Sequence, residues 1–173
     1  MRYGTLVSGW WIDGCYGRIL NYTDRHLQMY TDAIKAGNPH AIVAFNSDGM
    51  PVTTSRDRCT GSLDLPVIDC YSRFEQFTCG ESNAQLSFAD VPAGRSVDGI
   101  LWHKLAYLGT YWAAGKFNPF PPLSGKPNVS AMREYSMAVA QNGGAFTLDM
   151  QLFRNGSINR AQTSFLANAW KGL

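Results

Sequence analysis

Short apolar runs and longer amphipathic segments alternate along the chain. Thr5–Ile12 is apolar on both faces, which predicts a buried strand of a parallel sheet. Thr23 or Asp24 can cap a helix that runs to about Ala36, and Ala41–Phe45 is a second apolar strand. A strand, a helix and a strand within about 40 residues predict a βαβ unit with a parallel pair and a right-handed crossover.

The same alternation continues toward the carboxyl terminus, where long polar or irregular stretches separate the elements. The segment 97–108 is apolar and aromatic, and its pattern fits either a strand or a helix. The other expected elements are a short strand near Arg73–Thr78, a helix capped by Ser130 and ending near Gln141, a strand over Ala145–Leu148, and a last helix from Asn159. The helices are expected to bury two stripes: Met132, Tyr135, Met137 and Val139 on the first, and Phe165, Leu166 and Trp170 on the last. The pattern predicts an α/β fold with parallel strands and long strand-to-helix loops, in a single domain over residues 1–173.

Polar side chains stand at or just beyond the ends of the expected strands. They are Asp13, Asn46, Glu75 or Glu81, His103 and Asp149. In α/β barrels the chemistry lies at the carboxyl ends of the strands, so Asp13 is a candidate catalytic or substrate-orienting acid. The alternative is that Asp13-Gly14 only forms the turn that closes the strand.

Composition narrows the class of partner. The 173 residues are 45% hydrophobic, 13% aromatic and 16% charged, with a formal charge of +2. Because lysine and arginine are scattered, we expect no nucleic-acid partner; the aromatic content favours a neutral, hydroxyl-rich ligand such as a carbohydrate. The sequence contains no apolar run of 18 residues, so it predicts no membrane span. The first residues lack signal-peptide architecture, and a secreted or periplasmic parent protein stays an open alternative.

The four cysteines have no metal-binding spacing. No C-x-x-C pair occurs, and neither a phosphate loop nor a dinucleotide fingerprint is present, so we expect no metal and no cofactor. Cys59 and Cys70 flank a loop. The sequence is compatible with a disulfide between them and equally with two free thiols.

Several segments resemble one family in the same order along the chain. The segment Gly9-Trp10-Trp11-Ile12-Asp13-Gly14 resembles the nucleophile segment of α-L-fucosidases, which are retaining glycoside hydrolases. Further similar segments are Ala36–Asn46 (a helix-to-strand passage), Phe74–Glu81 (the region of the general acid/base) and Val139–Asp149 (the last barrel strand). The resemblance covers the carboxyl-terminal half of the family's eight-stranded barrel and implies a partial, half TIM-type (β/α) barrel.

The resemblance implies a pair of carboxyl groups as the catalytic machinery. Asp13 would be the nucleophile, and Glu75 or Glu81 the acid/base, with environments that keep one group ionised and the other protonated. The family comparison favours Glu75, whereas a position beyond the strand end favours Glu81, so both stay open. The alternative for each is an ordinary glutamate paired with Arg73 or Arg95.

Four more residues are candidates for binding the sugar. Trp11 and Trp102 offer flat apolar surface, while Asn46 and His103 offer hydrogen bonds. The alternatives are tryptophans in the core, an asparagine that caps its loop and a structural histidine.

Two functions of different classes follow from these residues. The first is retaining hydrolysis of a terminal α-L-fucoside, by a glycoside hydrolase or a fragment of one. The second is a non-catalytic sugar-binding or structural remnant that forms a homo-oligomer or pairs with a missing amino-terminal half, because half a barrel leaves strand edges open. An unrelated hydrolase or isomerase on a similar barrel is a third reading.

Overall fold

The computed structural model describes residues 3–15, 22–46, 58–60, 69–81, 86, 88–91, 93–97, 99–109, 112 and 128–173. The chain divides into two compact units. The first contains Met1–Glu81 and Ser96–His103, and the second contains Ser82–Arg95 and Lys104–Leu173. The organisation of residues 1–173 as one domain stays a prediction. The expected stretches 47–65 and 111–128 lie mostly outside the described residues.

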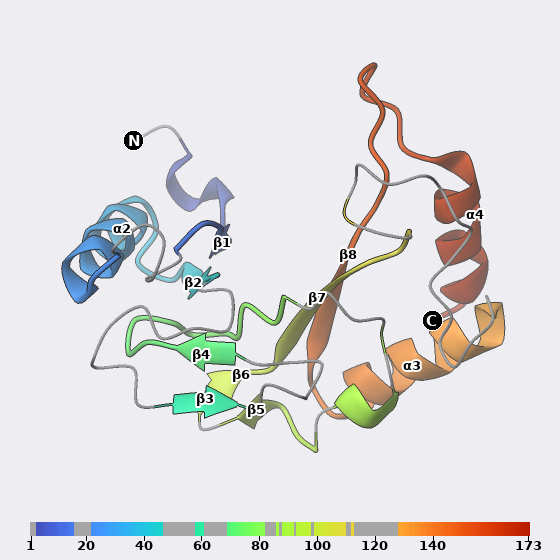
Figure 1. Ribbon diagram of the computed structural model, residues 1–173, viewed down its shortest axis with the longest axis horizontal. Coiled ribbons are helices and arrows are strands. Elements are labelled where there is room, and N and C mark those ends of the chain that lie inside the picture. Colours follow the sequence, from blue (N-terminus) through green and yellow to red (C-terminus); the bar gives the residue numbers. More distant parts are fainter. Residues whose placement is uncertain are drawn as a thin grey trace. The chain divides into compact units, whose positions relative to one another are not determined.

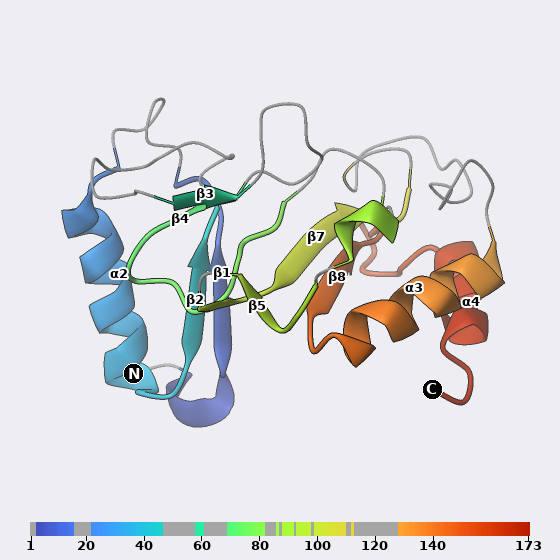
Figure 2. The same cartoon turned by 90° about the horizontal axis from the view of Figure 1, so that it is seen from below.

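The first unit begins with the predicted βαβ arrangement (Figure 1). Strand β1 (Gly9–Ile12) pairs in parallel with β2 (Ile42–Phe45), and helix α2 (Asp24–Gly37) connects them. Figure 2 shows the two strands side by side with α2 along one face. The parallel pair is confirmed.

Strand β1 is shorter than the sequence predicts. Residues Gly4–Leu6 form a 3-10 turn, η1, in which Gly4 has a φ of 50° and Leu6 is 87% exposed. Thr5 and Leu6 belong to this turn, and the hydrogen-bonded strand begins only at Gly9. The prediction of a strand over Thr5–Ile12 is therefore wrong in its first half.

Helix α2 forms where the sequence places it. It begins after Thr23, whose backbone N–H donates to His26 Nδ1 at 3.1 Å, and it ends before Asn38. Leu27 points into a core cluster with Cys15, Val43, Phe45 and Phe74, all of them buried.

The helix covers β2 more completely than β1. Val43 and Phe45 are fully buried, whereas Trp10 and Ile12, their partners in the ladder, are only half-buried. The prediction that the first strand is buried on both faces is therefore wrong. A helix about 10 Å across covers the strand beneath it and only part of the next.

A regular strand is absent over residues 73–78, although the segment still joins the sheet. The N–H of Gln76 donates to the Val43 carbonyl, and Leu101 donates to the Gln76 carbonyl, both at 3.0 Å. Phe77 and Leu101 form an isolated parallel bridge. Backbone hydrogen bonds thus continue from β2 through residues 76–78 to β6 (Ile100–Leu101).

Two further strand pairs among the described residues of the first unit are antiparallel, so the sheet structure is mixed. Strand β3 (Arg58–Thr60) pairs with β4 (Asp69–Tyr71), with Cys59 opposite Cys70 in the backbone register. Strand β5 (Ser96–Val97) pairs with β6 across a tight turn. Both alternatives for the two cysteines stay predictions.

The second unit combines one strand pair with two helices. Strand β7 (His103–Tyr107), of which all but His103 belongs to this unit, pairs with β8 (Ala145–Asp149). Helix α3 (Val129–Gln141) contacts both β8 and α4 (Arg160–Ala169), and a short 3-10 turn, η2, covers Phe88–Asp90. The described residues of the ambiguous segment 97–108 therefore form strands and a turn at Gly99, and none of them is helical.

Caps and buried stripes in this unit differ in part from the prediction. Asn128, rather than Ser130, caps α3, because its side-chain oxygen accepts the N–H groups of Ser130 and Ala131. Asn159 caps α4 as predicted. Met137 and Trp170 are 39% and 41% exposed, so each stripe is narrower than expected. None of the helices in the described ranges has the length and apolarity to cross a membrane.

Candidate active site

Asp13 and Asn46 lie at the same edge of the sheet because β1 and β2 run in parallel. The N–H of Asn46 donates to the Ile12 carbonyl at 2.8 Å, and the N–H of Cys15 donates to the Asn46 carbonyl at 2.9 Å. These bonds extend the ladder past both strand ends and fix the two backbones. Asn46 is fully buried, while Asp13 is exposed.

The side chain of Asn46 connects two candidate carboxylates. Its Nδ2 donates to Asp13 Oδ1 at 2.9 Å and also to Glu81 Oε2. The N–H of Gly14 donates to the same Asp13 oxygen at 2.7 Å. The structure thus brings Asp13, Asn46 and Glu81 together, although they are far apart in the sequence.

The spacing of these carboxylates follows from the geometry of an amide. The two N–H bonds of a planar NH2 group diverge by about 120°, so two acceptors at ordinary hydrogen-bond length lie about 5 Å apart. Asp13 and Glu81 accept from one such nitrogen. The two carboxylates are therefore neighbours across a single amide nitrogen.

Glu75 has a different environment. It is buried, with 4% exposure, and its Oε1 and Oε2 accept the N–H groups of Phe45 at 3.2 Å and Ser72 at 2.6 Å. Its carboxylate therefore accepts one backbone N–H group from β2 and one from the turn that precedes Glu75 in the sequence. Arg73, one of its two possible ion-pair partners, lies 3.6 Å from Asp24 and over the ring of Phe74.

The segment that carries Glu81 is held from two sides. Trp11 Nε1 donates to the Cys79 carbonyl at 3.0 Å. On the other side, Thr78 Oγ1 donates to the His103 carbonyl at 2.6 Å and accepts the His103 N–H at 2.8 Å. Gly80, with a φ of 62°, then turns the chain toward Glu81. Sequence reasoning overlooked Thr78 and Cys79; the glycine just before Glu81 was the available signal of a turn there.

His103 is half-buried beside this segment. Its Nδ1 lies 3.1 Å from the Thr78 carbonyl, and its ring meets Phe77 edge-on at 5.5 Å. Burial lowers the pKa of His103, while the backbone contacts with Thr78 and Cys79 oppose that shift. The imidazole is therefore mainly neutral at pH 7.

The two tryptophan candidates are placed differently. Trp102 is 9% exposed and lies in the core, so little of its face is open to a ligand. Trp11 is half-buried, and its N–H is used by the Cys79 carbonyl, which leaves the ring as its contribution to a site. Among the described residues, no group of three or more His, Cys, Asp or Glu side chains could hold a metal ion.

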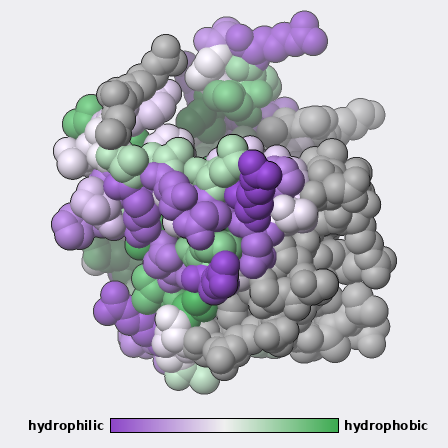
Figure 3. Space-filling model, turned by 90° about the vertical axis from the view of Figure 1, so that its left-hand side faces the viewer, coloured by the Kyte–Doolittle hydropathy of each residue, from purple (hydrophilic) through white to green (hydrophobic). Residues whose placement is uncertain are grey.

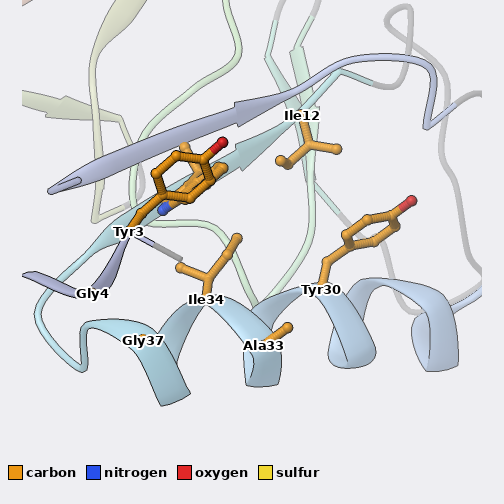
Figure 4. Close-up of a pocket in the computed structure, with 8 residues that line it drawn as sticks. Tyr3, Gly4, Ile12, Tyr30, Ala33, Ile34 and Gly37 are labelled. Atoms are coloured by element: carbon orange, nitrogen blue, oxygen red, sulfur yellow. The ribbon is translucent and has the colours of Figure 1, made fainter. Parts of the chain in front are cut away.

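A separate apolar cavity of about 380 Å³ lies on the other face of β1. Figure 4 shows Ile12 reaching from the strand toward Ile34 and Tyr30 on α2. Trp10, which meets Tyr3 edge-on at 5.8 Å, lines the same cavity. Because side chains alternate along a strand, Trp10 and Ile12 face away from Trp11 and from the carboxylate site.

Comparison with known proteins shows similarity of fold. The sequence matches no protein-family profile, and a comparison with curated proteins gave no match. Among solved structures, the endo-fucoidan hydrolase P5AFcnA of glycoside hydrolase family 107 is 17% identical, with a TM-score of 0.67 over 97% of this chain and 51% of that chain. A histidine-to-glutamine variant of a second such hydrolase, MfFcnA4, is 19% identical, with a TM-score of 0.65 over 97% and 28%.

An α-L-fucosidase, isoenzyme 1 from Paenibacillus thiaminolyticus, is 16% identical, with a TM-score of 0.59 over 98% of this chain and 34% of that chain. The chain thus has the α/β fold of part of these glycoside hydrolases and spans about half of their length or less. The resemblance to α-L-fucosidase-type hydrolases is confirmed at the level of the fold.

Proposed function

We propose that this chain carries the catalytic carboxyl pair of a retaining glycoside hydrolase that acts on an α-L-fucose-containing substrate, on part of a (β/α) barrel. The observation that carries the proposal is the amide of Asn46, which follows β2 and donates both to Asp13, which follows the parallel strand β1, and to Glu81. Two carboxyl groups that accept from the same NH2 group lie close together, which suits retention, because inverting enzymes hold their carboxyl groups about 6.5 to 9.5 Å apart.

In this proposal Asp13 is the nucleophile and Glu81 is the acid/base. The Asp13 carboxylate attacks the anomeric carbon as the bond to the leaving oxygen breaks, and Glu81 gives that oxygen its proton. Glu81 then takes a proton from water, the water oxygen attacks the anomeric carbon, and the bond to Asp13 breaks. The exposure of Asp13 and the half-buried position of Glu81 support these roles.

The surroundings favour Glu81 over Glu75 as the acid/base. Both oxygens of Glu75 accept backbone N–H groups, which stabilise the ionised form and hinder proton donation. His103 is the second candidate, because imidazole is the commonest acid/base group and His103 lies beside the segment that carries Glu81. The histidine-to-glutamine variant among the similar structures makes His103 worth testing in the same way.

The names of the similar structures define the substrates to try. One is an α-L-fucosidase, which suggests a terminal α-L-fucoside, and others are endo-fucoidan hydrolases, which suggest internal bonds of fucoidan. An aryl α-L-fucoside and fucoidan therefore form the two arms of the assay.

The decisive experiment replaces Asp13 by alanine and adds azide. We expect the variant to lose hydrolysis and to recover turnover with azide, releasing a fucosyl azide of inverted configuration. The same assay with E81Q, H103Q and E75Q then identifies the acid/base as the residue whose loss lowers kcat. Unchanged hydrolysis by D13A would contradict the nucleophile assignment.

A second candidate, a non-catalytic barrel remnant that needs a partner, is favoured by the half-covered face of β1. Trp10 and Ile12 are only half-buried beside the apolar cavity, and Tyr3, Leu6 and Met29 are 50%, 87% and 61% exposed. Figure 3, the side of the molecule that carries α2, shows green apolar patches among purple polar side chains.

A homo-oligomer or a complex with a separate amino-terminal half would cover this face. Size-exclusion chromatography with light scattering tests self-association directly. A monomer that hydrolyses an aryl fucoside by itself would exclude this second candidate.

A further inference from the structure

Asn46 differs from the other polar residues of the site because it is buried and belongs to neither carboxylate's segment. It has no exposed surface, and its backbone is fixed to Ile12 and Cys15 by hydrogen bonds of 2.8 and 2.9 Å. A polar side chain so deeply buried must satisfy its hydrogen bonds inside the protein. Its partners therefore define its role.

Both N–H donors of the Asn46 amide are accounted for. Nδ2 donates to Asp13 Oδ1 at 2.9 Å and to Glu81 Oε2. Its Oδ1 lies 3.7 Å from Cys79 Sγ, so the thiol can donate there and orient the amide with its NH2 group toward the carboxylates. A carboxamide has only two N–H bonds, so this arrangement leaves none for a sugar hydroxyl.

We infer that Asn46 is the positioning residue of the carboxyl pair, which it holds at a fixed separation, and that it does not bind the sugar. This inference rests on the proposed function, since it assigns the residue that makes the Asp13–Glu81 pair competent. A neutral double donor between two carboxylates offsets their repulsion, fixes both rotamers and adds no charge of its own.

The chain contains a matched control for Asn46. Asn38 is also a buried asparagine of the first unit, with 7% exposure, and it precedes β2 where Asn46 follows it. Its Nδ2 donates to the Val7 carbonyl at 3.0 Å, and its Oδ1 accepts the N–H of His40 at 3.0 Å. N38A thus removes a buried amide of the same size that contacts only the backbone.

The kinetic test compares N46A with N38A. For N46A we expect kcat on an aryl α-L-fucoside to fall about 100-fold while KM changes by less than about threefold, because a misplaced reacting group costs turnover rather than affinity. N38A should lower the stability of the fold and leave kcat and KM unchanged. A kcat for N46A that matches that of N38A would overturn the inference, as would a large change in KM alone.

A second variant guards against misfolding. N46D keeps the size of the side chain but replaces the NH2 group by an oxygen, so three carboxyl groups meet in one place. We expect its activity to be low at neutral pH and to recover partly as the pH falls, when a proton can bridge the new carboxyl and a neighbour. Activity of N46D equal to that of the wild-type protein at all pH values would contradict the positioning role.

A stability measurement keeps this inference separate from the proposed function. Urea unfolding of N46A, E81A and the double variant should show non-additive unfolding constants, with a coupling of about fivefold, because each single variant removes the contact between Asn46 and Glu81. If the wild-type protein hydrolyses no fucose substrate, the proposed function fails while this coupling still decides whether Asn46 holds Glu81. Additive effects would overturn the positioning role even in an active enzyme.

Discussion

Replacing Glu75 by glutamine tests which of the two glutamates is structural. The carboxylate of Glu75 is buried and accepts the N–H of Phe45 at 3.2 Å and the N–H of Ser72 at 2.6 Å. Glutamine has nearly the same shape but keeps only one acceptor oxygen, so its NH2 group must face one of these N–H donors.

The cost of E75Q can be worked out from these two contacts. A hydrogen bond to a charged group contributes about 1.5 to 3 kcal/mol, and an unsatisfied buried N–H costs about 1 to 3 kcal/mol. Because removing the buried charge offsets part of this loss, we expect the free energy of unfolding to fall by about 2 to 3 kcal/mol. With a urea m-value of about 2 kcal/mol/M, the unfolding midpoint falls by about 1 to 1.5 M.

E81Q is the matched comparison at the half-buried glutamate beside Asn46. Its glutamine oxygen can still accept from Asn46, so we expect a loss of stability below about 1 kcal/mol. Its kcat should fall about 100-fold or more, because the group that gives and takes the proton is lost.

The assay has two parts. Urea unfolding is monitored by tryptophan fluorescence, and hydrolysis of an aryl α-L-fucoside is measured without urea at equal concentrations of folded protein. E75Q should be less stable but retain kcat within a few-fold, and E81Q should show the reverse. An E75Q variant that is as stable as the wild-type protein but inactive would refute the reasoning and return the acid/base role to Glu75.

Three further predictions concern the supports of the site and the second unit. Burial lowers the pKa of His103, so the folded state binds a proton at this side chain less readily than the unfolded state, in which the pKa is near 6.5. The contribution of neutral His103 to the free energy of unfolding is therefore complete above about pH 6.5 and is lost as the pH falls through the folded-state pKa. H103Q should therefore remove part of the fall in the urea midpoint between pH 7.5 and pH 5, and an unchanged fall would contradict this. Trp11→Phe leaves the Cys79 carbonyl without its 3.0 Å donor and should cost about 1 kcal/mol in the same unfolding assay, with a cost near zero counting against this contact. Asn128→Ala should destabilise α3 by about 1 kcal/mol while Ser130→Ala has little effect, and the opposite order would restore Ser130 as the cap.

The sequence predicted the elements whose signals are local. Helix α2 begins after Thr23, one of its two expected caps, and ends within a residue of the expected position, and β2 follows as predicted. The parallel pairing of β1 with β2 then placed Asp13 and Asn46 at one edge, as expected from two strand ends. Periodicity, caps and turn residues act over a few positions, which is why these predictions succeeded.

The segment 73–78 shows where local reasoning fails. Its apolar pattern predicts a strand, but the side chains of Glu75 and Gln76 accept the N–H groups of Phe45 and Val43. A regular ladder would bond those N–H groups to backbone carbonyls. Side-chain oxygens here accept hydrogen bonds that backbone carbonyls accept in a regular sheet. Because the donors lie on a strand about 30 residues earlier in the sequence, no local pattern could predict this arrangement.

The sequence by itself determined a βαβ unit with acidic and amide side chains at its strand ends, and the family resemblance offered two glutamates as candidates for the proposed acid/base. Only the tertiary structure separated them, by placing Glu75 against the backbone of β2 and Glu81 against the Asn46 amide that also bonds Asp13. The reason is physical: residue type and spacing fix which chemistry is available, whereas hydrogen-bond partners distant in sequence fix the environment in which each group acts.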